Sequence, residues 1–190
     1  MKSAQLFYKI TGIALLAVTV VGCGTTNSVP YSASATNVIQ IKDRWGESDI
    51  RVKLNEFTGT KIGNMTCRLV GPVDPTPGKT VTEYIREAFQ QELFMAGIYS
   101  NNGEVIIDAN IDKLSFNSHF SGYWDIKMTL SSNMYNKEYQ VHSHYKFPTS
   151  YIAEYACRNV ANAFNPAVQD LLNKVVTHPQ FSALIGHRSD

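Results

Sequence analysis

Two histidines at alternate positions are the first residues whose types and spacing could do chemistry. His142 and His144 lie two residues apart, so on a β-strand both rings project from the same face and can approach one metal ion. A third ligand could come from His119 or Asp125. Histidines are also ordinary solvated residues on the polar face of a sheet that is covered on one side only. We therefore predict neither a metal ion nor another cofactor.

The carboxylates and serines give no stronger indication of catalysis. Asp108 and Asp112 fall on one face of a predicted strand, and Glu104 lies just before it. No residue that would tune the pKa of one carboxyl group is evident, so solvation explains these residues better than acid–base catalysis. Neither a serine nucleophile motif, nor a phosphate-binding glycine loop, nor a zinc-type Cys/His cluster is present in the sequence. We therefore expect a protein that is not an enzyme.

The composition is that of a folded protein with almost balanced charge. Of its 190 residues, 44% are hydrophobic and 17% are charged, which excludes an intrinsically disordered chain. Its 17 basic and 16 acidic residues leave a net charge of +1. Since binding to phosphates requires an excess of basic residues, we do not expect a nucleic-acid partner.

The first 22 residues have the features of a bacterial export signal. Lys2 and Lys9 provide a basic start, and an apolar run follows that is too short to span a bilayer. This run ends in Val20-Val21-Gly22-Cys23, which resembles the lipobox of bacterial lipoproteins. The resemblance implies cleavage before Cys23 and attachment of acyl chains to that cysteine, which would hold the protein on a membrane.

Three regions follow from this cleavage site. Residues 1–22 are the predicted signal peptide, residues 23–37 are an acylated cysteine with a flexible, small and polar tether, and residues 38–190 are a single periplasmic domain. The mature chain would have 15 basic and 16 acidic residues, so its attachment would depend on the acyl chains. Gly24 rather than Asp follows the cysteine, and in lipoproteins of bacteria with two membranes this implies an outer-membrane location facing the periplasm.

The pattern of apolar residues predicts an α+β fold of order β-α-β-β-β-α. Alternation predicts strands near residues 38–42 and 50–54 and three more at 105–112, 124–130 and 139–147, and helical spacing predicts helices at 80–97 and 150–177. Thr80 and Glu83 form a capping box at the start of the first helix. Pro166 should kink the second helix or divide it, with Asn165 as the N-cap. We expect an antiparallel sheet of about four strands with the two helices packed on one face.

Cys67 and Cys157 are the two cysteines beyond Cys23. In an exported protein such a pair most simply forms a disulfide, which here would restrain the long, aperiodic segment between Thr58 and Lys79. Two free buried thiols and a reactive or metal-binding pair remain alternatives, because cysteines 90 residues apart have no local signature.

Aromatic residues give the best indication of a binding surface. Phe116, Phe120, Tyr123 and Trp124 lie around a predicted bend between two strands, and Tyr135 lies in the next turn. Most such residues pack in a core or at its rim, but an exposed cluster could bind a partner protein, a glycan or a lipid.

In the order of its elements and in the helical segment 84–99, the chain resembles small α+β lipoproteins of the YajG-like and transport-auxiliary groups. The resemblance implies a non-enzymatic lipoprotein that holds or docks an envelope protein partner in transport or assembly across the cell envelope. The alternative is a periplasmic module that binds a small apolar or glycan ligand between sheet and helices, and a third hypothesis is an envelope hydrolase.

Overall fold

Three long strands form the centre of the computed structural model, which describes residues 26–27, 29–59 and 65–187. Strands β6 (Val105–Asn117), β7 (Gly122–Ser132) and β8 (Tyr135–Phe147) pair in antiparallel order through two hairpins. The short strands β2 (Val52–Leu54) and β3 (Thr58–Gly59) both pair in parallel with β6. These five strands make one mixed sheet. The predicted signal peptide and Cys23 lie outside the described residues.

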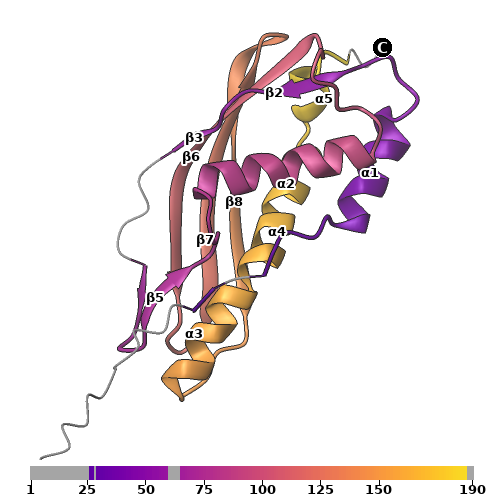
Figure 1. Ribbon diagram of the computed structural model, residues 1–190. Coiled ribbons are helices and arrows are strands. Elements are labelled where there is room, and N and C mark those ends of the chain that lie inside the picture. Colours follow the sequence, from indigo (N-terminus) through magenta and orange to yellow (C-terminus); the bar gives the residue numbers. More distant parts are fainter. Residues whose placement is uncertain (1–25, 28, 60–64, 188–190) are drawn as a thin grey trace, which may run out of the picture.

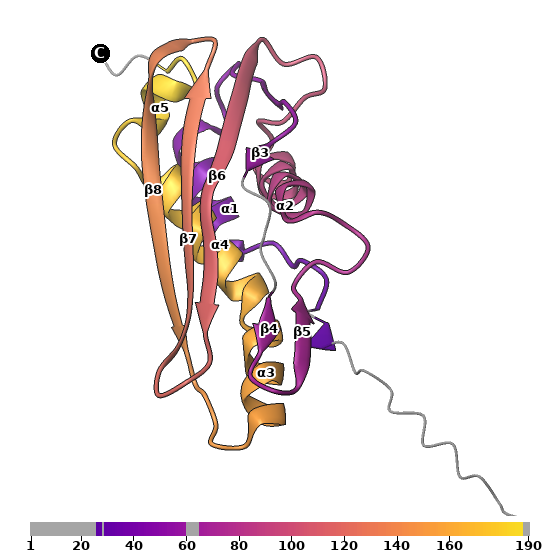
Figure 2. The ribbon, with the colours of Figure 1, turned by 90° about the vertical axis from the view of Figure 1, so that its left-hand side faces the viewer.

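Three helices cover one face of this sheet, as Figures 1 and 2 show. They are α2 (Val81–Met95), α3 (Ala153–Asn162) and α4 (Phe164–Val176), with α1 (Ala35–Trp45) beside α2 and α4 and the short α5 (Phe181–Leu184) near the end of the chain. The capping box predicted at Thr80 and Glu83 is present at the start of α2. The predicted α+β fold, with helices on one face of a sheet, is confirmed.

The space between sheet and helices is filled by side chains. Every second residue of β7 from Trp124 to Leu130 is fully buried, and so are large residues of the helices such as Phe89 and Phe164. The Trp124 ring lies 4.8 Å from the Phe164 ring, and its Nε1 donates a hydrogen bond of 2.9 Å to the Val160 carbonyl. The predicted alternation of buried and polar residues in the three long strands is therefore confirmed.

The sheet is mixed rather than antiparallel as predicted. The chain passes from β2 through α2 before it reaches β6, and a connection that contains a helix returns the chain in the same direction. Alternation of apolar residues identifies a strand with one buried face, but it carries no information on the direction of the neighbouring strand. The sequence therefore predicted the strand at residues 50–54 without its parallel pairing.

A second, smaller sheet has two of its three strands in the segment between Thr58 and Lys79, which was predicted to be irregular. Strands β4 (Thr66–Cys67) and β5 (Gly71–Asp74) form an antiparallel hairpin, and β1 (Thr26–Asn27) pairs in parallel with β5. Figure 2 shows this small sheet beside α3, at the lower end of the molecule. Strands of two to four residues are too short to show a periodic pattern, which is why the sequence did not predict them.

The strand predicted at residues 38–42 is wrong, because these residues belong to α1. Ser34 caps this helix by accepting a hydrogen bond from the backbone N–H of Asn37. Asn37, Ile41 and Trp45, which are spaced four residues apart, are its buried residues. One of the three is polar, so the helical spacing was not recognised as an apolar stripe.

The predicted tether at residues 23–37 is wrong for its described part. The Pro30 carbonyl accepts a hydrogen bond of 2.9 Å from Asn165, and the Ser32 carbonyl accepts one of 2.6 Å from Gln169. Helix α1 then begins at Ala35. The segment before α1 lacks an apolar pattern because its backbone carbonyl groups, rather than apolar side chains, bind side chains of α4.

The helix predicted at residues 150–177 is divided, but not at the predicted position. Helix α3 ends at Asn162 and α4 begins at Phe164, with Ala163 between them. Asn165 is therefore not the N-cap, and Pro166 is the third residue of α4. Proline is tolerated there because backbone N–H groups of the first turn have no partner within the helix.

Candidate functional site

Large apolar side chains are exposed together at one end of the molecule. They come from the β4–β5 turn, the β6–β7 loop and the start of α3, which lie near one another at the lower end in Figure 1. The fractional exposures are 102% for Leu69, 103% for Phe120, 104% for Tyr151, 58% for Ile152 and 49% for Tyr155. We call these five residues the apolar end. Exposed apolar side chains gathered in this way make this end a candidate interaction surface.

Arg68 connects the three segments that form the apolar end. Its backbone has a φ of 51°, a left-handed conformation that is unfavourable for a residue with a side chain. Its guanidinium group donates hydrogen bonds to the backbone carbonyl and the hydroxyl of Ser118 and to the Tyr151 carbonyl. Thr149 also donates to the Ser118 carbonyl. The exposed side chains therefore project from loops that hydrogen bonds hold in place.

The predicted disulfide between Cys67 and Cys157 is present at the base of the apolar end. Both cysteines are fully buried, and their Cα atoms are 5.7 Å apart. The bond joins β4 to α3, one residue before Arg68. Together with Arg68 it fixes the β4–β5 turn against α3.

The five aromatic residues predicted to bind a partner do not form one cluster. Trp124 is buried in the core with Phe116 packed against it at 5.2 Å between ring centres. Phe120 belongs to the apolar end. Tyr123 projects from the opposite face of β7 and packs on the His144 ring at 4.5 Å, whereas Tyr135, at the far end of the sheet, accepts a hydrogen bond from Gln180.

The structure places His142 and His144 beside Asp125 on the open face of the sheet. Ligand atoms of these three residues all lie within 4.8 Å of one another, and the shortest contact, from His142 Nε2 to Asp125 Oδ1, is 2.7 Å. His119, the other candidate ligand, lines a pocket at the apolar end instead. Such a trio could bind a divalent cation, but Lys113 already contacts Asp125 Oδ2 at 3.0 Å.

Electrostatics supports an ordinary polar network at Asp125. Partial burial raises the pKa of Asp125, but hydrogen bonds from Lys113 and His142 and the charge of Lys113 outweigh this effect, so its pKa lies below the usual value. The carboxylate therefore already has cationic and polar neighbours that stabilise it. We interpret the three residues as a polar patch on the surface.

The other residues considered for catalysis take part in structural hydrogen bonds. Asp108 accepts one from Asn55, and Asp112 accepts one from Thr129 and another from Gln140. Among the serines of the three long strands, Ser143 is fully buried and donates a hydrogen bond to Asp170. These arrangements hold strands and helices together.

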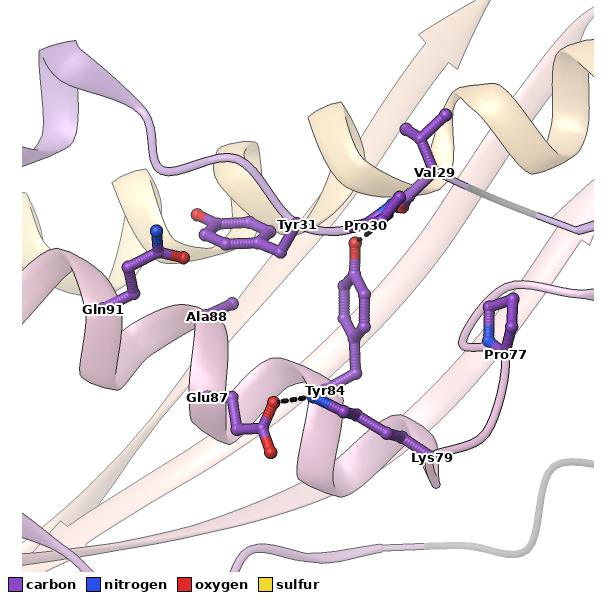
Figure 3. A pocket seen from close by; sticks show the side chains of 9 residues that line it. All are labelled: Val29, Pro30, Tyr31, Pro77, Lys79, Tyr84, Glu87, Ala88 and Gln91. Carbon is purple, nitrogen blue, oxygen red and sulfur yellow. Dashed lines mark hydrogen bonds and ion pairs between the residues drawn. The ribbon is translucent and has the colours of Figure 1, made fainter.

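A pocket of about 400 Å³ lies on the outer side of α2 (Figure 3). Tyr84 lines this pocket and points toward Val29 and Pro30. Its hydroxyl donates a hydrogen bond of 3.4 Å to the Val29 carbonyl. An ion pair between Lys79 and Glu87 borders the opposite side. The sequence did not predict this pocket because it depends on the N-terminal segment packing against α2.

Next to this pocket, Glu92 is a buried carboxylate that binds the N-terminal segment. The Tyr31 hydroxyl donates to Glu92 Oε1 at 2.5 Å, the backbone N–H of Ser34 donates to the same oxygen at 3.0 Å, and Asn37 Nδ2 donates to Oε2 at 3.0 Å. Asn37 also donates to the Gln169 carbonyl of α4. Glu92 follows Ala88 by four residues and so lies on the apolar stripe of the predicted helix. A charged residue on that stripe was the signal from which a buried carboxylate could have been predicted.

The ionisation of Glu92 should make stability depend on pH. Burial raises its pKa above the ordinary value of 4.5, although hydrogen bonds from Tyr31, Ser34 and Asn37 oppose the shift. The folded state therefore binds this proton more tightly than the unfolded state does. The contribution to stability is complete below pH 4.5 and is lost as the pH rises through the pKa of the folded protein.

We expect the unmodified protein to lose stability relative to the variant Glu92→Gln as the pH rises from 4 to 8. Urea unfolding of both proteins at several pH values measures this difference in unfolding free energy. Only the difference is informative, because Asp125, with its lowered pKa, contributes with the opposite sign. A difference that does not change with pH would show that Glu92 titrates alike in both states.

Comparisons with known proteins give distant structural likenesses and no family. A scan of family models finds no match to this sequence, and a search of curated proteins finds none either. A crystal structure of a Xanthomonas campestris protein described as DUF330 is 9% identical, with a TM-score of 0.48 over 79% of this chain and 92% of that one. A crystal structure of an uncharacterized protein is 7% identical, with a TM-score of 0.44 over 80% and 99% of the two chains. Both likenesses are too distant to transfer a family or a function.

None of the helices in the described part of the chain is both long enough and apolar enough to cross a membrane.

Proposed function

We propose that this protein is a lipid-anchored accessory protein of the bacterial cell envelope, which docks a protein partner close to the membrane and is not an enzyme. The proposal places the acyl chains on Cys23 and the folded body on the periplasmic side of the outer membrane. The lipobox-like sequence at residues 20–23 and Gly24 support it.

The observation that carries the proposal is how early the folded body begins. Strand β1 starts at Thr26, three positions after Cys23, and pairs with β5. Three residues span at most about 11 Å. An acylated Cys23 would therefore hold the whole body against the bilayer, which suits a protein that positions a partner there.

The open face of the main sheet is the surface that we assign to the partner. Helices cover the opposite face, and β8 ends the strand order of the described sheet. Tyr123, His142 and His144 project from this open face, and aromatic and polar side chains together favour a protein contact. An edge strand can also accept a further strand from a partner.

Replacement of Cys23 by Ser tests the anchor. We expect the unmodified protein to incorporate labelled palmitate and to sediment with membranes, and Cys23→Ser to take up no label and to lose its membrane association. Met95→Ser, at an exposed position of α2, is the control and should still be labelled and membrane-bound. A Cys23→Ser variant that remains in the membrane fraction would overturn the proposal.

Photo-crosslinking tests the docking role. A photo-crosslinking residue replaces Tyr123, the probe is activated in intact cells, and the adducts are identified by mass spectrometry. We expect a defined protein adduct, and the same probe at Met95, an exposed residue at the end of α2, should not yield it. Recovery of lipid or another small molecule without any protein would favour the alternative, a binding module.

The pocket beside Tyr84 favours that alternative, a module that binds a small ligand. The space between sheet and helices, where the sequence suggested that such a ligand would bind, is filled by side chains, which argues against that position.

A further inference from the structure

We propose that the apolar end is a lipid-binding surface, which inserts Leu69, Phe120 and Tyr151 among the headgroups and upper acyl chains of the bilayer. The inference rests on the proposed anchor at Cys23 and adds the orientation of the body on the membrane. The long strands would then point away from the bilayer.

The direction of the chain leads to this assignment. Strand β5 runs away from the turn that carries Leu69, and β1 is parallel to it, with Thr26 opposite Val73. The N-terminal end of β1 therefore faces the side of that turn. Because Cys23 precedes Thr26 by only three positions, acyl chains on Cys23 would enter the bilayer within about 11 Å of Thr26, near the strand that leads from this turn.

The chemistry of the apolar end suits a lipid interface. The side chains of Leu69, Phe120 and Tyr151 are fully exposed to solvent, and this exposure has a free-energy cost that insertion into a membrane would remove. Tyrosine is favoured at such interfaces because its ring is apolar and its hydroxyl is polar. Arg158, which packs over the Tyr155 ring at 4.9 Å, places a guanidinium group where lipid phosphates would lie, and Glu154 adds one opposing charge.

The hydrogen bonds of Arg68 and the disulfide explain why this surface stays exposed. Flexible loops would fold such side chains back onto the body, whereas the loops here are joined to one another and to α3. A fixed set of projecting apolar side chains loses little conformational entropy when it enters a bilayer.

Depth-dependent fluorescence quenching tests the inference on the mature, acylated protein. The variant Phe120→Trp is incorporated into vesicles of phosphatidylcholine and phosphatidylglycerol that contain phosphatidylcholine brominated on its upper acyl chain. The matched control is Phe94→Trp, a phenylalanine with 69% exposure in the last turn of α2. The native residues Trp45 and Trp124 are buried, and the unmodified protein supplies their background.

We expect the emission from position 120 to fall by about half, since interfacial side chains reach about 5–10 Å into the headgroup and acyl boundary, and the emission from position 94 to remain unchanged. Equal quenching at both positions, or none at position 120 in incorporated protein, would overturn the proposed orientation and leave the anchor intact. If mass spectrometry shows that the protein carries no acyl chains, both the proposed anchor and the proposed orientation are overturned. The mass therefore distinguishes failure of the anchor from failure of the orientation alone.

A photo-crosslinking residue at Phe120 in intact cells separates lipid from protein as the occupant. Lipid adducts support the inference, and a defined protein adduct at this position overturns it in favour of a second protein contact.

Discussion

Loss of the Cys67–Cys157 disulfide is expected to destabilise the protein by about 4 kcal/mol, because the bond closes a long loop that the unfolded chain would otherwise leave open. The two cysteines are separated by 90 residues, and both are fully buried. Chemical unfolding of the double variant Cys67→Ala/Cys157→Ala, compared with the oxidised protein, measures this cost.

The same change should loosen the apolar end. Arg68 follows Cys67 directly, so trypsin should cleave after Arg68 faster in the double variant than in the oxidised protein. Reductant provides the control, since it should destabilise the unmodified protein and leave the double variant unchanged. A loss of stability below about 1 kcal/mol would show that the hydrogen bonds of Arg68 hold the turn without the disulfide.

The second large effect is expected from Glu92→Ala, at about 3 kcal/mol of unfolding free energy. The substitution removes the acceptor of hydrogen bonds from Tyr31, Ser34 and Asn37, of which Asn37 is buried and the other two are half-buried. Chemical unfolding measures the total cost, and hydrogen exchange of residues 29–45 should increase because this segment loses its contact with α2.

Glu87→Ala is the matched control, because Glu87 lies on the same helix and makes an ion pair with Lys79 at the surface. Exposed ion pairs contribute less than about 1 kcal/mol, so this variant should remain close to the unmodified protein. Equal losses in the two variants would contradict the role assigned to Glu92.

The parts of the fold that the sequence predicted correctly depend on local patterns. The capping box at Thr80 and the alternation in β6, β7 and β8 each use neighbouring residues, which report directly on local structure. The N-terminal segment was misassigned because its conformation depends on Glu92 and Asn165, which lie more than 50 residues away. No local pattern records such contacts.

The candidate site shows the same limit. The spacing of His142 and His144 correctly placed both on one face, but only the register of β7 against β8 decides between Asp125 and His119 as their neighbour. The apolar end combines Leu69, Phe120 and Tyr151 from three distant segments. Of these, Phe120 is the one that the sequence placed among the candidate binding residues, because it lies among other aromatic residues.

The pairing of β1 with β5 has a consequence for the order of events during maturation. Thr26 and Asn27 are held by Val73 and Asp74, whereas a signal peptidase and an acyltransferase need the neighbouring chain extended in their own active sites. If Cys23 is the processed residue, binding of the residues next to it by these enzymes competes with the pairing of β1 with β5. Cleavage and acylation would then precede the pairing of β1 with β5, which would take place with the protein already on its membrane.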